Sequence, residues 1–279
     1  MDDLLADRLA ALDGALRELG SVVVAFSGGA DSAFLLAAAA RSLGAGDVVA
    51  ATAVSPSLAT HELAAAADFA AELGVRHETP RTDEMSRDGY RANAGNRCYF
   101  CKAELLDVLR PLADRLAIPH VATGTNADDA VAGFRPGIRA AAERGAVTPL
   151  RDAGFTKAQV RAASCEWGLR TWDKPALACL SSRVAYGVTI TPQRLARVEQ
   201  AEVSLRAALD SAGVGVRDLR VRDLGDRARV EVDAELVDWL VARPDVLDCI
   251  AGFDAVEVDP RGFRSGSMNE ALASRGPTS

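Results

Sequence analysis

Glycine, serine and aspartate residues directly follow a short apolar run near the beginning of the sequence. The run, Val22 to Phe26, is typical of a buried strand and continues into SGGADS at positions 27–32. Glycines let the backbone approach an oxygen atom closely, and the free N–H groups of a helix N-terminus favour negative charge. The stretch therefore predicts a site for a phosphate chain. No lysine follows the glycines, so it is not a Walker A loop. The simpler alternative is a glycine-rich turn in which Asp31 and Ser32 cap the helix.

A second polar group follows another predicted strand, His120 to Ala122, and reads GTNADD at positions 124–129. Small hydroxyl and amide groups followed by paired carboxylates suit a nucleotide or a Mg²⁺ ion at the end of a strand. The alternative is a helix N-cap with acidic residues in the first turn, and the two interpretations are compatible. The loop from Ala53 to Ser57 follows a third predicted strand. It is expected to stand beside the first stretch and to line an adenosine.

Cysteine is the next residue type whose spacing suggests chemistry. Cys98 and Cys101 form a Cys-x-x-Cys pair at the predicted start of a helix, where the helix dipole stabilises thiolates. The pair suggests redox chemistry or two metal ligands, and the alternative is two semi-buried cysteines that arose by chance. Cys179 lies between Lys174 and Arg183, and nearby cations favour a nucleophilic thiolate. The alternative for Cys179 is a small buried apolar residue. The odd total of 5 cysteines favours reduced thiols or a metal site over a disulfide framework.

The elements that must position these residues alternate between apolar strands and amphipathic helices over residues 1–187. Such alternation predicts an α/β fold with a doubly wound parallel sheet, whose ligands lie at the carboxyl ends of the strands. Val147 to Leu150 is expected to be the last short strand of this sheet.

A smaller α+β domain is expected over residues 188–270. A long helix from Pro192 precedes two alternating segments, 219–224 and 228–232, which predict a hairpin. Arg220 and Arg222 share one face of the hairpin, because alternate strand residues point the same way. With Arg264 and Ser265 they suit a phosphate or sulfate group, and the alternative is a solvated surface. The last residues, 271–279, are expected to be disordered.

Composition excludes several classes of protein. A formal net charge of −7 argues against a general nucleic-acid or membrane-surface protein, since both need a basic face. The first residues lack the basic start and continuous apolar run of a signal peptide, and no apolar stretch is long enough to span a bilayer. We therefore expect a soluble cytoplasmic protein without nucleic-acid or membrane partners.

Taken together, the motifs resemble one family of enzymes. SGGADS is similar to the pyrophosphate loop of the ATP pyrophosphatase superfamily, whose members cleave ATP between the α- and β-phosphates. In combination with NRCYFCK, GTNADD, FRPG, WDKPALACLSSR, RVEQAE and GFRSGSMN, it resembles the LarE family over nearly the whole chain. Members of that family are ATP-dependent sulfur transferases of nickel-pincer nucleotide cofactor assembly.

The resemblance implies an adenine nucleotide alpha hydrolase-like fold and an AMP-forming sulfur transfer to a small nucleotide substrate. ATP adenylates a carboxylate of pyridinium-3,5-dicarboxylate mononucleotide, and sulfur then displaces AMP to give a thiocarboxylate. Asp31 and Cys179 would be catalytic. The residues implied to bind ATP and Mg²⁺ are Ser27, Gly28, Gly29, Asp31, Ser32, Ala53, Gly124, Thr125, Asn126 and Asp128. Those implied to hold the substrate are Arg97, Arg183, Glu202, Arg220, Arg222, Arg264 and Ser265.

The family supplies sulfur in two ways. In one, the lone cysteine, here Cys179, gives up its own sulfur. In the other, a Cys-x-x-Cys pair joins that cysteine to bind a [4Fe–4S] cluster through three thiolates. Cys98, Cys101 and Cys179 match the second pattern, so a cluster is expected. The resemblance also implies a homo-oligomer, namely a hexamer, and enzymes of the nickel-pincer pathway as partners.

Two other functions remain open at this point. A tRNA thiolase or another adenylating enzyme with the same loop would share the cysteine pattern, although the acidic net charge argues against RNA binding. A nucleotide- or cluster-sensing protein would bind the same ligands without turnover, and an assay for released pyrophosphate separates it from an enzyme.

Overall fold

The computed structural model describes residues 3–131, 136–175, 178–264 and 266–268 of the 279-residue chain. Contacts between residues divide the chain into two compact units. The first unit comprises Met1–Glu84 and Cys98–Leu177, and the second comprises Met85–Arg97 and Ala178–Ser279. None of the described helices is both long and apolar enough to cross a membrane.

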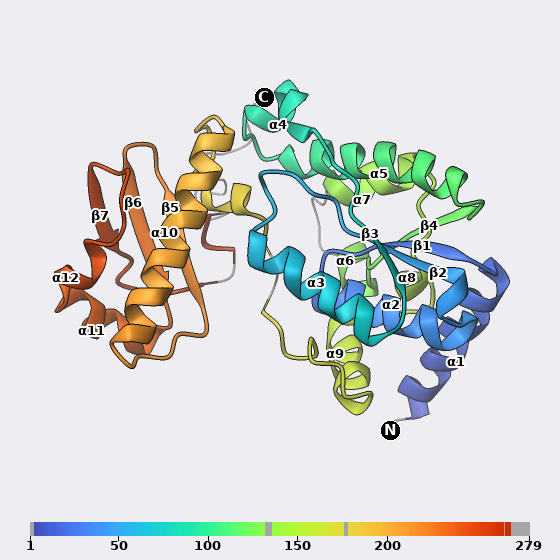
Figure 1. The fold of residues 1–279 in the computed structure, drawn as a ribbon. Coiled ribbons are helices and arrows are strands. Elements are labelled where there is room, and N and C mark those ends of the chain that lie inside the picture. Colours follow the sequence, from blue (N-terminus) through green and yellow to red (C-terminus); the bar gives the residue numbers. More distant parts are fainter. Residues whose placement is uncertain (1–2, 132–135, 176–177, 265, 269–279) are drawn as a thin grey trace. The chain divides into compact units, whose positions relative to one another are not determined.

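A parallel sheet forms the centre of the first unit (Figure 1). Its strands are β1 (Val22–Ala25), β2 (Val48–Ala51), β3 (Arg76–Glu78) and β4 (His120–Thr123), in the spatial order β3-β2-β1-β4. All three pairings are parallel. The chain moves outward from β1 to β3 and then returns to the other side of β1, so the strand order reverses between β1 and β4. Doubly wound sheets bind ligands at such a reversal, beyond the carboxyl ends of the strands.

Helices cover both faces of this sheet, which confirms the predicted α/β fold (Figure 1). Strand residues alternate between the faces, so Val22 and Val24 join one buried cluster while Val23 and Ala25 join another. The first face is covered by α1 (Asp3–Leu19), α2 (Ala30–Leu43), α3 (Thr60–Glu72), α8 (Pro149–Asp152) and α9 (Lys157–Glu166). The second face is covered by α5 (Arg97–Arg115) and α7 (Pro136–Glu143).

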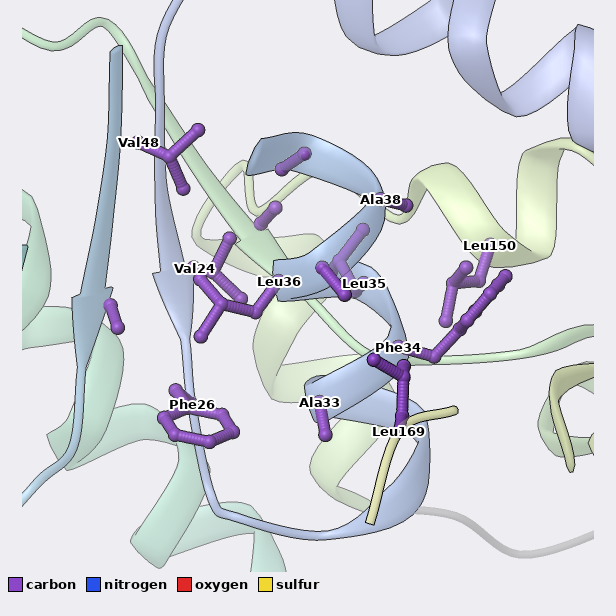
Figure 2. Packing of buried hydrophobic residues seen from close by; sticks show 14 of the residues in the cluster. Val24, Phe26, Ala33, Phe34, Leu35, Leu36, Ala38, Val48, Leu150 and Leu169 are labelled. Atoms are coloured by element: carbon purple, nitrogen blue, oxygen red, sulfur yellow. The ribbon is translucent and has the colours of Figure 1, made fainter. Parts of the chain in front are cut away.

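Helix α2 packs tightly against the first face (Figure 2). Its Phe34, Leu35 and Leu36 are fully buried, and Leu36 lies beside Val24 of β1. This burial holds the beginning of α2 close to the end of β1, and the SGGADS stretch is the connection between them. Short elements complete the first unit: η1 (Ala45–Asp47), η2 (Glu84–Ser86, which runs into the second unit) and α6 (Ala127–Val131).

The prediction of a strand at Val147 to Leu150 is wrong. Val147 makes only an isolated parallel bridge to Ala122 of β4. Pro149 then begins α8 as the first helical residue. Proline suits that position because its missing N–H is not needed there, whereas it cannot donate to a strand ladder.

The second unit contains the expected hairpin (Figure 1). Strands β5 (Leu219–Asp223) and β6 (Arg227–Val232) are antiparallel, and β7 (Ala255–Val258) runs parallel to β6. The long helix α10 (Pro192–Ser211) packs on this sheet through Ala201, Leu205 and Leu209. The remaining short elements are α4 (Asp88–Arg91), η3 (Leu180–Arg183), η4 (Ala234–Leu236), α11 (Val237–Val241) and α12 (Pro244–Leu247).

The division between the units differs from the boundary expected near residue 187. Residues 178–187 and 85–97 both group with the C-terminal residues. The buried side chain of Asn93 explains the grouping, since its amide nitrogen lies 3.2 and 2.8 Å from the carbonyl oxygens of Val184 and Ala185. The N–H of Ala185 in turn donates to the carbonyl of Asp223 at the end of β5, at 2.8 Å. The tail expected to be disordered, 271–279, lies outside the described residues.

Candidate functional site

The SGGADS stretch forms a compact loop between β1 and α2. The hydroxyl of Ser32 donates to the carbonyl of Gly29 at 3.1 Å and lies 3.1 Å from the hydroxyl of Ser27. Gly28 has a φ of +75°, which favours glycine. Gly29 is the N-cap of α2, and no side chain caps the helix. The alternative in which Asp31 and Ser32 are capping residues is therefore not what the structure shows. The N-terminal N–H groups of α2 keep their capacity to bind an anion.

Gly124 brings the end of β4 against this loop. A Cβ atom at this position would lie 2.8 Å from the backbone nitrogen of Ser32, a distance at which the backbone must shift. Only glycine permits this approach, which is a physical reason for the glycine at the first position of GTNADD. Two residues further on, the amide nitrogen of Asn126 donates to a carboxylate oxygen of Asp31 at 3.2 Å. The hydroxyl of Thr125 lies 3.0 Å from that of Thr123 within β4. The two predicted ligand motifs thus meet at the strand-order reversal.

Asp31 is the charged group at the centre of this contact. Burial raises the pKa of its carboxyl group, and this effect outweighs the opposing influence of Lys157 and the hydrogen bond from Asn126. The ammonium group of Lys157 lies 3.7 Å from the Asp31 carboxylate. A carboxylate that is costly to keep charged favours an added cation, and Mg²⁺ accompanying a phosphate chain is such a cation.

The two carboxylates of GTNADD differ in their partners. Asp129 receives the N–H of Asn126 at 3.2 Å and donates its own N–H to the Asn126 side chain at 3.1 Å, which is a reciprocal cap. The capping alternative is thus confirmed for Asp129. Asp128 instead accepts the N–H of Lys157, the first residue of α9, at 2.8 Å. Its carboxylate is anchored beside the loop.

The loop after β2 continues to pair with the segment after β3. The N–H groups of Thr52 and Val54 donate to Glu78 and Pro80 on the β3 side, so the N–H of Ala53 points toward β1. On that side, the hydroxyl of Thr52 donates to the carbonyl of Phe26 at 2.8 Å. Main-chain N–H and C=O groups at such a position can read the edge of an adenine ring, as expected for Ala53.

Two sets of side-chain hydrogen bonds in this region were not indicated by the sequence motifs. The hydroxyls of Ser55 and Ser57 both donate to one oxygen of buried Glu84, at 2.5 and 2.6 Å. The imidazole of His77 lies 2.8 Å from the hydroxyl of Thr52. The only sequence signal was the unusual Ser-Pro-Ser turn at 55–57.

Lys174 also lies at the loop. Its ammonium group donates to the carbonyl of Gly28 at 3.2 Å and to the carboxylate of Glu62 at 2.7 Å. The motif WDKPALACLSSR includes this lysine, but its distance from SGGADS in the sequence hid the contact.

Arginines gather on one face of the β5–β6 hairpin in the second unit. Arg222 is buried and forms an ion pair with buried Glu231 at 2.6 Å. It also donates to the carbonyl of Ser182 and to the hydroxyl of Ser267, each at 3.0 Å. Burial, together with nearby Arg183 and Arg222, lowers the pKa of Arg220 to about 10. A guanidinium whose charged form is disfavoured in this way gains from an added anion.

The other residues expected to hold a substrate lie around this hairpin. Glu202 of α10 forms an ion pair with Arg183 at 2.9 Å and accepts the N–H of Val221 at 3.1 Å. Arg97 is buried and donates to Asn93 and, at 2.9 Å, to the carbonyl of Ser181, which places it under the 178–187 segment. The carbonyl of Arg264 accepts the N–H of Ser267 at 3.2 Å. Ser265 lies outside the described residues.

The three cysteines of interest belong to different units. Cys98 is exposed and Cys101 is half-buried, and their spacing puts them on one side of the first turns of α5. Cys179 is exposed and precedes η3 in the second unit. Arg183 donates to the carbonyl of Cys179 at 3.1 Å. Among the described residues, no group of three or more His, Cys, Asp or Glu side chains is arranged to hold a metal ion.

Comparison with known proteins shows two relatives that align with almost the whole chain and a third that aligns with part of it. No protein-family model matches the sequence. An uncharacterized protein of Synechocystis sp. is 41% identical over 274 residues, which cover 96% of this chain and 99% of the relative. A pyridinium-3,5-bisthiocarboxylic acid mononucleotide synthase of Lactiplantibacillus plantarum is 36% identical over 271 residues, 96% of both chains. An uncharacterized protein of Methanocaldococcus jannaschii is 26% identical over 175 residues, 62% of this chain and 66% of the relative.

Proposed function

Because the chain belongs to the LarE family, we propose that it is an ATP-dependent sulfur transferase that converts a carboxylate of pyridinium-3,5-dicarboxylate mononucleotide into a thiocarboxylate. The observation that carries the proposal is the SGGADS loop, placed at the strand-order reversal with Gly124 and Asn126 packed against it. The relative from Lactiplantibacillus plantarum is named for a bisthiocarboxylic acid product of this kind.

The first step is adenylation. A carboxylate oxygen of the substrate attacks the α-phosphorus of ATP, the bond from that phosphorus to the bridging oxygen breaks, and pyrophosphate leaves. In this proposal Ser27, Gly28, Gly29 and Ser32 bind the β- and γ-phosphates through main-chain N–H groups and hydroxyls. Asp31 and Asp128 hold Mg²⁺, Gly124 and Asn126 position Asp31 and the loop, and Ala53 and Thr125 line the nucleoside.

The second step replaces AMP by sulfur. A carboxylate is a poor electrophile, whereas the acyl carbon of an acyl-adenylate is a good one because AMP leaves readily. When sulfide attacks that carbon, the bond to the AMP oxygen breaks and the thiocarboxylate remains. When the Cys179 thiolate attacks, a thioester forms, and its Cβ–Sγ bond must then break with loss of the Cα proton, which releases the thiocarboxylate and leaves dehydroalanine. Cys179 is the catalytic sulfur residue of the proposal.

The arginine face of the second unit is proposed to bind the phosphate of the substrate mononucleotide. Arg220 is the best candidate for direct contact, because its charge is disfavoured by burial and by like charges and an anion would relieve both. Arg222 and Arg183 already have carboxylate partners, Glu231 and Glu202. Their role is therefore to position Arg220 and to add positive potential. Arg97, Arg264 and Ser265 complete the proposed substrate set.

Cys98, Cys101 and Cys179 are proposed to hold a [4Fe–4S] cluster. The donor set fits by its chemistry, since thiolates are the usual ligands of such clusters, Cys98 and Cys179 are exposed, and the Cys98–Cys101 pair lies at the start of a 19-residue helix whose dipole favours thiolates. Such a cluster would provide sulfide for repeated turnover. Anaerobic preparation should therefore give a brown protein with iron and labile sulfide. If reconstituted protein holds no iron and Cys179 instead loses the mass of H₂S after one turnover, the cysteine supplies its own sulfur.

The proposed activity is tested by product analysis. With ATP, Mg²⁺ and pyridinium-3,5-dicarboxylate mononucleotide, the protein should release pyrophosphate and AMP. The Asp31→Ala variant should lose at least about a hundredfold in rate, because it removes the carboxylate at the phosphate site. Binding of ATP without pyrophosphate release would contradict the proposal and favour a nucleotide-sensing protein.

A further inference from the structure

The peptide group between Gly28 and Gly29 is central to phosphate binding and yet intrinsically free to turn. Gly28 has φ +75°, and Gly29 has φ −81° with ψ 161°. Rotation of this peptide plane changes only the ψ of Gly28 and the φ of Gly29, and glycine tolerates the altered values of both. Two orientations are therefore accessible. One directs an N–H group toward the phosphates, and the other directs a carbonyl oxygen toward them, which would repel the anion.

Lys174 selects between these orientations. Its ammonium group donates to the carbonyl of Gly28 at 3.2 Å. In a planar trans peptide the C=O and the following N–H point in opposite directions. The N–H of Gly29 therefore points away from Lys174 and toward the interior of the loop, where the hydroxyl of Ser27 lies 3.4 Å from the Gly29 nitrogen.

Lys174 is itself held in place. Glu62 of α3 pairs with it at 2.7 Å, and the two side chains are only 24% and 15% exposed. Burial opposes ionisation of Glu62, but hydrogen bonds from His61 and Lys174 outweigh it and lower the pKa of that carboxyl group. The backbone of Lys174 is also anchored, because Arg161 of α9 donates to its carbonyl at 2.8 Å.

We propose that Lys174 is a positioning residue that fixes the Gly28–Gly29 peptide with its N–H toward the phosphates, and that Glu62 keeps the lysine in place for this task. The proposal rests on the phosphate-binding role of the loop in the proposed function. In a Walker A motif a lysine from the loop itself contacts the phosphates. Here a lysine from a distant segment acts on the loop peptide from the opposite side.

The test is the affinity of the full-length protein for two probes, inorganic pyrophosphate and α,β-methylene-ATP, each with Mg²⁺, by calorimetry. Lys174→Met should weaken both by on the order of tenfold to a hundredfold, the range for loss of a hydrogen bond to a charged group. Lys174→Arg, which can still donate to the Gly28 carbonyl, should stay within about threefold of the original. Equal affinities for Lys174→Met and the original protein overturn the proposal.

A double-mutant cycle separates peptide orientation from a direct effect of the lysine charge. Alanine at position 29 adopts φ −81° readily, but peptide rotation would take φ to about +100°, which alanine strongly disfavours. In a Gly29→Ala background, Lys174→Met should therefore cost no more than about threefold in affinity. An undiminished loss in that background shows that the charge acts directly and overturns the proposal. The cycle compares the effect of Lys174→Met within each background, so a change in affinity caused by Gly29→Ala itself cancels.

These outcomes are distinct from failure of the proposed function. If the original protein binds neither pyrophosphate nor α,β-methylene-ATP, the assignment of the loop itself is wrong, and the role of Lys174 falls with it. If the original protein binds both and the Lys174 variants do not differ from it, only the positioning role is wrong.

Discussion

The pyrophosphate-type loop of the first unit and the arginine face of the second unit are both suited to anions, but they are built in opposite ways. The loop offers main-chain N–H groups and hydroxyls on a backbone of small residues, with Lys157 and Lys174 at its edge. The arginine face offers guanidinium groups that are largely buried, and Arg222 and Arg183 already have carboxylate partners.

This difference shows how each region balances stability against binding. In the loop, the partly buried charge is that of Asp31, which lies 3.7 Å from Lys157, and the other groups that could bind an anion are uncharged main-chain N–H groups and hydroxyls. On the arginine face, buried positive charge would be costly without Glu231 and Glu202, so most of its charge maintains the fold of the hairpin. Burial and the neighbouring Arg183 and Arg222 lower the pKa of Arg220 to about 10, so an added anion would favour its charged form. Three predictions test this contrast, from the largest expected effect to the smallest.

The largest effect is expected at the buried ion pair. Arg222→Ala leaves Glu231 buried without its cation, which should cost about 3–5 kcal/mol of local stability. Hydrogen exchange of peptides that cover 219–232 measures this loss within the second unit. The matched control is Arg229→Ala on the facing strand, since Arg229 and its partner Glu257 are each 38% exposed and the pair should contribute only about 0–1 kcal/mol. Equal costs for the two variants would contradict the structural role of Arg222.

A smaller effect is expected where β4 meets the loop. Gly124→Ala places a methyl group 2.8 Å from the nitrogen of Ser32, so the loop must shift. We expect a loss of roughly 1–3 kcal/mol in stability and about tenfold weaker binding of α,β-methylene-ATP. Gly14→Ala is the control, because nothing lies within 4 Å of a Cβ at that helical position. It should raise stability by roughly 0.5–1 kcal/mol and leave nucleotide affinity unchanged. Unaltered nucleotide binding by Gly124→Ala would show that the loop tolerates this change.

The smallest effect concerns His77 beside the loop after β2. Thr52 donates its hydroxyl proton to Phe26, so it must accept from His77, which requires a hydrogen on Nε2 of the imidazole. Burial lowers the pKa of His77 from 6.5, despite the opposing charge of Glu78. The unfolded chain therefore binds a proton at His77 more readily than the folded chain does. The stability that depends on neutral His77 is fully present above pH 6.5 and is lost as the pH falls through the lowered pKa.

Urea midpoints measured from about pH 7.5 down to about pH 5.5 should therefore fall less steeply for His77→Gln than for the original protein. Identical slopes for His77→Gln and the original protein would show that His77 does not contribute to the pH dependence of stability.

Much of this protein was determined by local sequence. The apolar run at 22–26, the small residues of SGGADS and the periodicity of the following segment are enough for a strand, a turn and a helix, because each depends on neighbours a few residues away. The same holds for the hairpin around Gly225-Asp226 and for the capped helix that begins at Pro192. Val147 to Leu150 was wrongly predicted as a strand because its apolar residues suit one. Pro149 instead favours the first position of a helix.

Only the tertiary structure shows which side chains, distant in sequence, form hydrogen bonds that position these local segments. Lys174 lies 146 positions from the Gly28 carbonyl it binds, and Asn93 lies 91 positions from the Val184 carbonyl it binds. The hairpin register places Arg220 directly opposite Glu231, yet the buried ion pair is the diagonal one between Arg222 and Glu231. Neither periodicity nor spacing carries such information, because a hydrogen bond across the fold depends on the packing of the whole core and not on the order of residues along the chain.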